Sequence, residues 1–204
     1  MQGKRENTDE ILREVAKDKP FYETSGGGMT ISGGEPAFQP EAVLELIEKA
    51  KAMEIGTAIE TCGEGRADFF YRAFALDALF LYDIKGLDPQ RHLKNTGADN
   101  RLILKNLQML MDLGAKIILR IPLIPGVNDT DKDLELLRAF LLENKEHYLY
   151  AEIMPYHPLG VEKMKRLGKP AQEVFPDGRA YTEKWLARLR ISGTDVRVSG
   201  QTNE

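Results

Sequence analysis

The stretch Met29-Thr30-Ile31-Ser32-Gly33-Gly34-Glu35-Pro36 is a short apolar strand that ends in two glycines, an acid and a proline. The glycines permit positive φ and close approach of the backbone to a ligand. Pro36 stiffens the exit from the turn, and an ionised Glu35 can accept charge-assisted hydrogen bonds from an ammonium group. A plain glycine turn is the alternative, but the order strand, Ser-Gly-Gly-Glu-Pro, helix favours a ligand site.

Six apolar runs typical of strands alternate with helical patterns along the chain. The runs cover residues 29–32, 57–61, 79–84, 116–123, 149–154 and, more weakly, 195–198. Helical spacing joins Val43, Leu46, Ile47 and Ala50, then Ile103, Leu107, Leu110 and Met111, then Leu134, Leu137 and Leu141. The alternation predicts an α/β fold with a parallel sheet, which is either doubly wound or an incomplete (β/α) barrel.

Residues that start and stop helices lie between these runs. Asn7 and Glu10 form a capping pair, and Gly56 and Gly114 stand where helices are expected to end. No linker divides the sequence, so we expect a single domain over residues 1–204.

Composition places the chain among globular proteins. Its 204 residues are 42% hydrophobic and 29% charged, with a net charge of -4. The sequence has no basic stripe for binding a phosphate backbone, so nucleic acid is not expected as a partner. No apolar run approaches the roughly 20 residues that span a bilayer, and the polar first residues lack the apolar segment of a signal peptide. We therefore expect a cytoplasmic protein without membrane contact.

Side chains that can bind ligands or take part in catalysis lie at the ends of five predicted strands. They are Glu35, then Glu60 and Thr61, then Asp83 and Lys85, then Arg120, and finally His157. In a barrel the carboxyl ends of the strands meet at one rim, where active sites form. Polar residues at strand ends also mark the passage from core to solvent, but five such ends together favour a site.

Five ordered motifs resemble those of the glycyl-radical enzyme activating enzymes, whose best-known member is the pyruvate formate-lyase activating enzyme. The motifs are Thr30-Ile31-Ser32-Gly33-Gly34-Glu35-Pro36, Glu60-Thr61-Cys62-Gly63, Asp83-Ile84-Lys85, Arg120-Ile121-Pro122-Leu123-Ile124-Pro125-Gly126-Val127-Asn128 and Pro155-Tyr156-His157-Pro158-Leu159-Gly160. The resemblance implies a partial (β/α)6 TIM-like barrel of the radical S-adenosylmethionine type, without its first strand.

The resemblance also implies a set of cofactor-binding residues, and no catalytic residue, in this chain. They are Gly33, Gly34, Glu35, Thr61, Asp83, Lys85, Arg120 and His157. By resemblance, the first three bind the methionyl amino group of S-adenosylmethionine, and Asp83, Lys85 and His157 contact the rest of the cofactor. Asp83 and Lys85 are alternatively a surface ion pair, which is common and weak.

Arg120 lies inside an apolar strand, so we expect it to pair with an acid or to hold a carboxylate, because an unpaired buried charge is costly. By resemblance, Glu60, Thr61 and Asp83 form a site for a monovalent cation, which oxygen ligands suit. Glu60 alternatively faces solvent. Cys62, beside them, is expected to be a small buried residue.

The cluster ligands of the family have no counterpart in this sequence. The family holds a 4Fe-4S cluster on three cysteines of one Cys-x-x-x-Cys-x-x-Cys loop, and this chain has Cys62 alone. We expect cluster binding in the full-length protein only. The sequence is either a piece of a longer protein, which the intact remaining motifs favour, or a degenerate relative. His92 and His147 are expected to be solvated and without a ligand role.

The resemblance implies that the full-length protein is an oxidoreductase that cleaves S-adenosylmethionine reductively. It would install a glycyl radical on a partner enzyme, such as pyruvate formate-lyase, with electrons from a flavodoxin or ferredoxin, and this chain alone would be inactive. Two other functions stay open. One is a non-catalytic module that binds S-adenosylmethionine or a nucleotide, and the other is an unrelated barrel enzyme using Glu35, Asp83 and Lys85 for acid-base chemistry.

Overall fold

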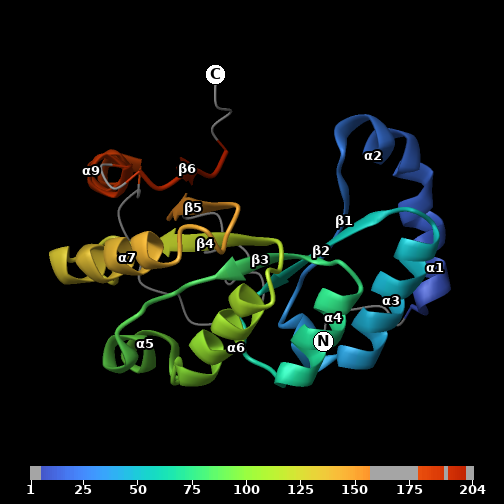
Figure 1. Ribbon diagram of the computed structural model, residues 1–204, viewed down its shortest axis with the longest axis horizontal. Coiled ribbons are helices and arrows are strands. Elements are labelled where there is room, and N and C mark those ends of the chain that lie inside the picture. The colour runs from blue at the N-terminus through green and yellow to red at the C-terminus, as the bar shows by residue number, and fades with distance from the viewer. Residues whose placement is uncertain (1–5, 157–178, 191–192, 201–204) are drawn as a thin grey trace, which may run out of the picture. The chain divides into compact units, whose positions relative to one another are not determined.

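A computed structural model describes residues 6–156, 179–190 and 193–200. Helices and strands alternate along the chain (Figure 1). The elements are α1 (Thr8–Val15), η1 (Ala16–Asp18), α2 (Lys19–Ser25), β1 (Gly28–Ile31), η2 (Pro36–Phe38), α3 (Pro40–Ala52), β2 (Gly56–Thr61), α4 (Ala67–Ala75), β3 (Leu79–Asp83), α5 (Pro89–Thr96), α6 (Arg101–Asp112), β4 (Ile117–Leu123), α7 (Asp131–Glu143), β5 (Tyr150–Pro155), α9 (Arg179–Arg190) and β6 (Val196–Val198). The sheet has six strands in the order β1-β2-β3-β4-β5-β6, which confirms the predicted α/β fold.

Contacts between residues divide the chain into two compact units. The first comprises residues 1–82 and 102–117, and the second comprises residues 83–101 and 118–204. The single domain expected over residues 1–204 stays a prediction. Each predicted strand agrees with an observed strand to within one residue at either end.

In the first unit, β1 pairs in parallel with β2, and β2 pairs in parallel with β3. Ile31 lies opposite Ile59, and Thr61 lies opposite Tyr82. Because parallel strands point the same way, their carboxyl ends lie along one edge, and the turn after β1 stands beside the end of β2.

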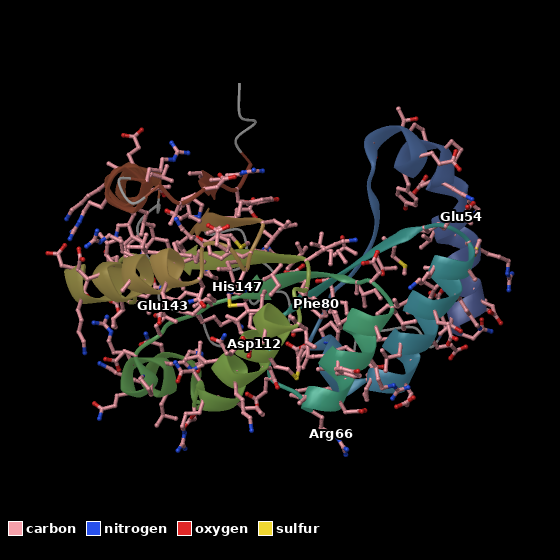
Figure 2. The ribbon with its side chains drawn as sticks, viewed as in Figure 1. Glu54, Arg66, Phe80, Asp112, Glu143 and His147 are labelled. Atoms are coloured by element: carbon pink, nitrogen blue, oxygen red, sulfur yellow. The ribbon has the colours of Figure 1, made fainter. Side chains whose placement is uncertain are left out.

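Apolar side chains of the helices and strands pack together in the core of the first unit. Leu12 of α1 packs with Leu46 and Ala50 of α3, and α3 also contacts α4 (Figure 1). Phe80 of β3 is fully buried, and its ring lies 6.5 Å from that of Phe70 in α4. Figure 2 shows Phe80 among the side chains of the interior. These contacts fix the strands whose ends carry the predicted site residues.

The helix ends agree with the sequence predictions except at one glycine. Asn7 and Glu10 form a reciprocal capping box at the start of α1, and Gly114 takes a φ of 72° after the end of α6. Gly56 does not end a helix: it begins β2, and Glu54 takes the positive φ of 58° after α3. Every described helix is too short or too polar for a membrane crossing.

The second unit is built on β4, β5 and β6, which pair in parallel. Arg120 lies opposite Glu152, and Glu152 lies opposite Arg197, so charged residues follow one another across the three strands. Helix α9 contacts α7, β5 and β6 (Figure 1). Its buried Trp185 and Leu189, with Leu134, Leu137 and Leu141 of α7, form the apolar layer of this unit.

Candidate functional site

Glu35 stands at the end of the turn after β1, and its carboxylate joins this turn to the end of β2. Oε1 accepts hydrogen bonds from the Thr61 hydroxyl at 2.6 Å and from the Ala37 N–H at 3.2 Å. Oε2 accepts one from the Cys62 N–H at 2.9 Å. A carboxylate offers about four acceptor positions. Within the described part of the chain these donors fill three of them, which leaves one on Oε2.

The turn before Glu35 exposes bare backbone. Gly33 and Gly34 take φ values of 89° and 57°, a region that residues with a Cβ seldom adopt. Both are exposed, and a Cβ added to either would meet no described atom within 4 Å. The conformation of the turn therefore requires glycine, and its backbone is open to a ligand.

Thr61 and Glu60 are consecutive in β2 but make separate contacts. Thr61 is 2% exposed, and its hydroxyl accepts from the Gly63 N–H at 2.9 Å while it donates to Glu35. Glu60 accepts from the Ser32 hydroxyl at 2.9 Å. Neighbouring strand residues point to opposite faces, which explains why the two side chains have different partners. Binding of cofactor by Thr61 stays a prediction.

The cation site that the resemblance implies at Glu60, Thr61 and Asp83 also stays a prediction. Glu60 and Thr61 belong to the first unit and Asp83 to the second. Over the described ranges, no group of three or more His, Cys, Asp and Glu side chains could hold a metal ion. Cys62 was expected to be buried but is only half-buried, because it lies in the loop that follows β2.

Tyr82 packs against the loop that follows β2, next to Gly63. Gly63 takes a φ of 82°, and a Cβ there would lie 1.8 Å from the Tyr82 hydroxyl oxygen, so only glycine fits. Tyr82 is fully buried and donates to the Ile103 carbonyl at 2.6 Å. Burial, with the nearby Cys62 and acidic groups, raises the pKa of Tyr82 far above its usual range. The phenol therefore stays protonated and keeps donating.

In the second unit, Arg120 pairs with acids as the sequence predicted. Its Nε lies 3.8 Å from Asp83 Oδ1 and 4.0 Å from Glu152 Oε2, and it donates to Met154 Sδ at 3.1 Å. The side chains of Arg120 and Asp83 are 14% and 19% exposed, so their charges interact in a partly desolvated environment.

Glu152 is a charged neighbour of Arg120 that the sequence analysis missed. It faces Arg120 across β4 and β5, and Arg197 across β5 and β6. The guanidinium of Arg197 in turn lies 3.7 Å from the centre of the Tyr150 ring. The sequence did contain a signal for Glu152. It lies between the buried Ala151 and Ile153 in β5, and side chains alternate between the two faces of a strand.

The remaining predicted residues have different outcomes. Lys85 follows β3 and is exposed, while His157 lies outside the described residues. His147 is exposed as expected. His92 was expected to be solvated, and this was wrong: it is 3% exposed, and its Nδ1 lies 2.8 Å from the Ala98 carbonyl oxygen, so it holds the end of α5. Its lack of a ligand role stays a prediction.

The sequence matches the family model of the radical SAM superfamily over residues 2–138, and the chain belongs to this superfamily. It is 42% identical over 168 residues to the choline trimethylamine-lyase activating enzyme of Oleidesulfovibrio alaskensis, covering 81% of this chain and 54% of that protein. It is 39% identical over 201 residues to the trans-4-hydroxy-L-proline dehydratase activating enzyme of Clostridioides difficile, covering 97% and 67%. These relatives confirm the resemblance to glycyl-radical enzyme activating enzymes and exclude an unrelated barrel enzyme.

Solved structures agree with this assignment. The fold matches a domain of the pyruvate-formate lyase-activating enzyme from Bacteroides vulgatus with a TM-score of 0.70 and 25% identity, covering 85% of this chain and 99% of that one. SuiB of Streptococcus suis shares the fold, with a TM-score of 0.74 and 14% identity over 98% of this chain and 44% of that one. The chain spans about half the length of the first of the curated relatives named above.

Proposed function

We propose that this chain is the part of a glycyl-radical enzyme activating enzyme that positions S-adenosylmethionine. The observation that carries the proposal is the Glu35 carboxylate, which three donors orient and which retains one acceptor position beside an open glycine turn. A carboxylate held in this way suits an ammonium group, because the charge-assisted hydrogen bond forms without reorganisation of the site. Membership of the radical SAM superfamily supports S-adenosylmethionine as the source of that ammonium.

The residues of the first unit fit the methionyl end of the cofactor. Glu35 would accept one ammonium hydrogen on Oε2, and the backbone of Gly33 and Gly34 would lie against the amino acid portion. Thr61 is buried and bonded to Glu35 and Gly63, so we propose that it serves cofactor binding by orienting the carboxylate.

In the second unit, Asp83, Lys85 and Arg120 remain our proposed contacts for the other polar groups of S-adenosylmethionine, together with His157. Lys85 supplies a compact positive charge and Arg120 a fork of donors, and both suit a carboxylate. The Asp83 carboxylate would accept hydrogen bonds from hydroxyl groups of the cofactor.

An iron-sulfur cluster does not fit the residues of this chain. Three thiolates on one loop are needed, and the sequence contains one cysteine, Cys62, which follows β2. Thiolates for a 4Fe-4S cluster would therefore come from residues outside this sequence. When bound to such a cluster, S-adenosylmethionine supplies the radical chemistry that the superfamily is named for.

The whole protein's activity and partners are likewise proposals. We propose that it removes a hydrogen atom from a glycine of a partner enzyme, receives electrons from a flavodoxin or ferredoxin, and works in the cytoplasm without nucleic acid or membrane. The relatives named above are activating enzymes of a choline trimethylamine-lyase and of a trans-4-hydroxy-L-proline dehydratase.

Calorimetry tests the binding step. The chain of residues 1–204 is titrated with S-adenosylmethionine and, separately, with 5'-methylthioadenosine, which lacks the amino acid group. We expect S-adenosylmethionine to bind more tightly, because it alone of the two carries an ammonium group that can donate a hydrogen bond to Glu35. Equal affinity for the two compounds, or no binding of S-adenosylmethionine, would contradict the proposal.

A module that binds S-adenosylmethionine without cleaving it is the second candidate function. Such a module would need only the Glu35 site and no cysteine ligands. Extension of the coding sequence upstream distinguishes the two: an in-frame Cys-x-x-x-Cys-x-x-Cys segment supports the activating enzyme, and its absence supports the binding module.

A further inference from the structure

Asn106 is a polar residue on the apolar face of α6. It is 1% exposed and shares this face with the buried Ile103, Leu107 and Leu110. A buried amide costs free energy unless its donors are satisfied, so its partners show why the helix tolerates it.

Both partners of the Asn106 amide lie in the loop that follows β2. Its Nδ2 donates to the Gly63 carbonyl and to the Gly65 carbonyl, each at 2.9 Å. An amide nitrogen carries two hydrogens, so both are used. Asn106 thereby fixes two backbone groups of a loop that has no regular secondary structure.

The loop held by Asn106 supplies the donors that orient Glu35. The Gly63 N–H bonds to Thr61, whose hydroxyl donates to Glu35 Oε1, and the Cys62 N–H donates to Glu35 Oε2. A Cβ on Gly63 would lie 1.8 Å from the Tyr82 hydroxyl oxygen, so Tyr82 packs closely against the loop at this residue. A chain of contacts therefore runs from α6 to the carboxylate.

We propose that Asn106 is a positioning residue for Glu35, an inference that rests on the proposed binding of S-adenosylmethionine. By holding the Gly63 and Gly65 carbonyls, it keeps the Cys62 N–H against Glu35 Oε2. This directs the remaining acceptor position of Oε2 toward the ligand ammonium. Without Asn106, the loop after β2 would move and the Glu35 carboxylate would move with it. The carboxylate would then no longer be oriented toward the ligand ammonium.

The test replaces Asn106 with a residue of similar branched shape that lacks donors, Asn106→Leu. Asn144→Leu is the matched control, because Asn144 is 8% exposed and donates from Nδ2 to the Phe140 carbonyl at 2.9 Å, in the other unit. Amide hydrogen exchange is measured in the unliganded chain, and affinity for S-adenosylmethionine is measured by calorimetry.

In Asn106→Leu we expect the Cys62 and Gly63 amides to exchange at least about fivefold faster than in the wild type, because the loop opens more readily. We expect affinity for S-adenosylmethionine to fall by about tenfold. Asn144→Leu is expected to leave both quantities at wild-type values even if it lowers the melting temperature. Asn106→Ser, whose hydroxyl can satisfy one carbonyl, is expected to give intermediate values and serves if Asn106→Leu does not fold.

Unchanged exchange at Cys62 and Gly63 in a folded Asn106 variant would overturn the proposal, as would equal loss of affinity in the Asn144 control. If the wild-type chain binds no S-adenosylmethionine, the proposed function fails, and the exchange rates still decide whether Asn106 positions Glu35.

Discussion

The strand ends of the two units hold their charged groups in different ways. In the first unit, Glu35 receives three hydrogen bonds of 2.6 to 3.2 Å from the polypeptide itself. In the second, Arg120 Nε lies 3.8 Å from Asp83 Oδ1 and 4.0 Å from Glu152 Oε2, beyond hydrogen-bond length. Hydrogen bonds fix the first carboxylate, whereas the two ion pairs of Arg120 act through charge, beside the hydrogen bond that its Nε donates to Met154 Sδ. A carboxylate held by hydrogen bonds has a defined orientation, whereas a longer ion pair constrains the orientation of its groups less.

Replacing Glu35 should have the largest effect on binding. In Glu35→Gln, the amide nitrogen would face the Cys62 N–H or Thr61, donor against donor, and the charge for the ammonium is lost. We expect affinity for S-adenosylmethionine, measured by calorimetry, to fall roughly 30-fold or more, the weight of a hydrogen bond to a charged group. The control is Glu41→Gln, since Glu41 is an exposed acid that pairs with Arg72. A similar loss in Glu41→Gln would show a general charge effect instead.

The second-largest effect is expected from Thr61→Val, and it is an effect on stability. Valine keeps the volume of threonine but removes the donor to Glu35 and the acceptor for the Gly63 N–H. Because both groups become unsatisfied in a buried place, we expect the free energy of unfolding to fall by about 2 kcal/mol. Thr61→Ser keeps the hydroxyl and should cost less. Urea denaturation measures both, and equal losses in the two variants would mean that the hydroxyl does not hold the site.

Arg120 variants probe the second unit and should have a smaller effect. We expect Arg120→Leu to weaken binding of S-adenosylmethionine by about fivefold, within the range for partly exposed charge pairs. Arg120→Lys keeps the charge and should recover part of the loss. Raising the salt concentration should reduce the difference between wild type and Arg120→Leu, because salt screens charge. A salt-independent difference would contradict a role that acts through charge.

The smallest effect expected is a change in pH dependence from Tyr82. Because burial raises its pKa in the folded state, Tyr82 keeps its proton there while the unfolded chain loses it above about pH 10. The unfolded state then binds fewer protons, so stability declines as pH rises through that value. The free energy of unfolding of the wild type should therefore fall between about pH 9.5 and about pH 10.5. We expect this fall to be smaller in Tyr82→Phe, by up to about 1 kcal/mol. Identical slopes in chemical denaturation would show that Tyr82 does not contribute.

The sequence predicted the strands well because their signal is local. Short apolar runs bounded by glycine, proline and polar residues coincide with β1 to β6 to within one residue. The end of α3 was less predictable. Glu54 takes a left-handed conformation that glycine would be expected to supply, and Gly56 instead lies at the start of β2, where the backbone of Gly27 approaches closely.

The supports of the site were harder to find because they depend on contacts distant in sequence. Asn106 lies 43 residues from Gly63, although its place on an apolar helix face could have marked it as a buried donor. His92 looked like a solvated residue because α5 is polar, and only the fold shows that its ring is enclosed. Glu35 could be proposed from the sequence because the glycines beside it are a local signal.

The most direct test of the central claim follows backbone amide signals of the isotope-labelled chain by NMR during titration with S-adenosylmethionine. If Glu35 is held by the loop and receives the ammonium, the Cys62, Gly34 and Ala37 amides should shift in a saturable way. Methionine should produce the same shifts at higher concentration, and adenosine should not. Saturable shifts with adenosine alone, or no shift at these amides with S-adenosylmethionine, would contradict the account.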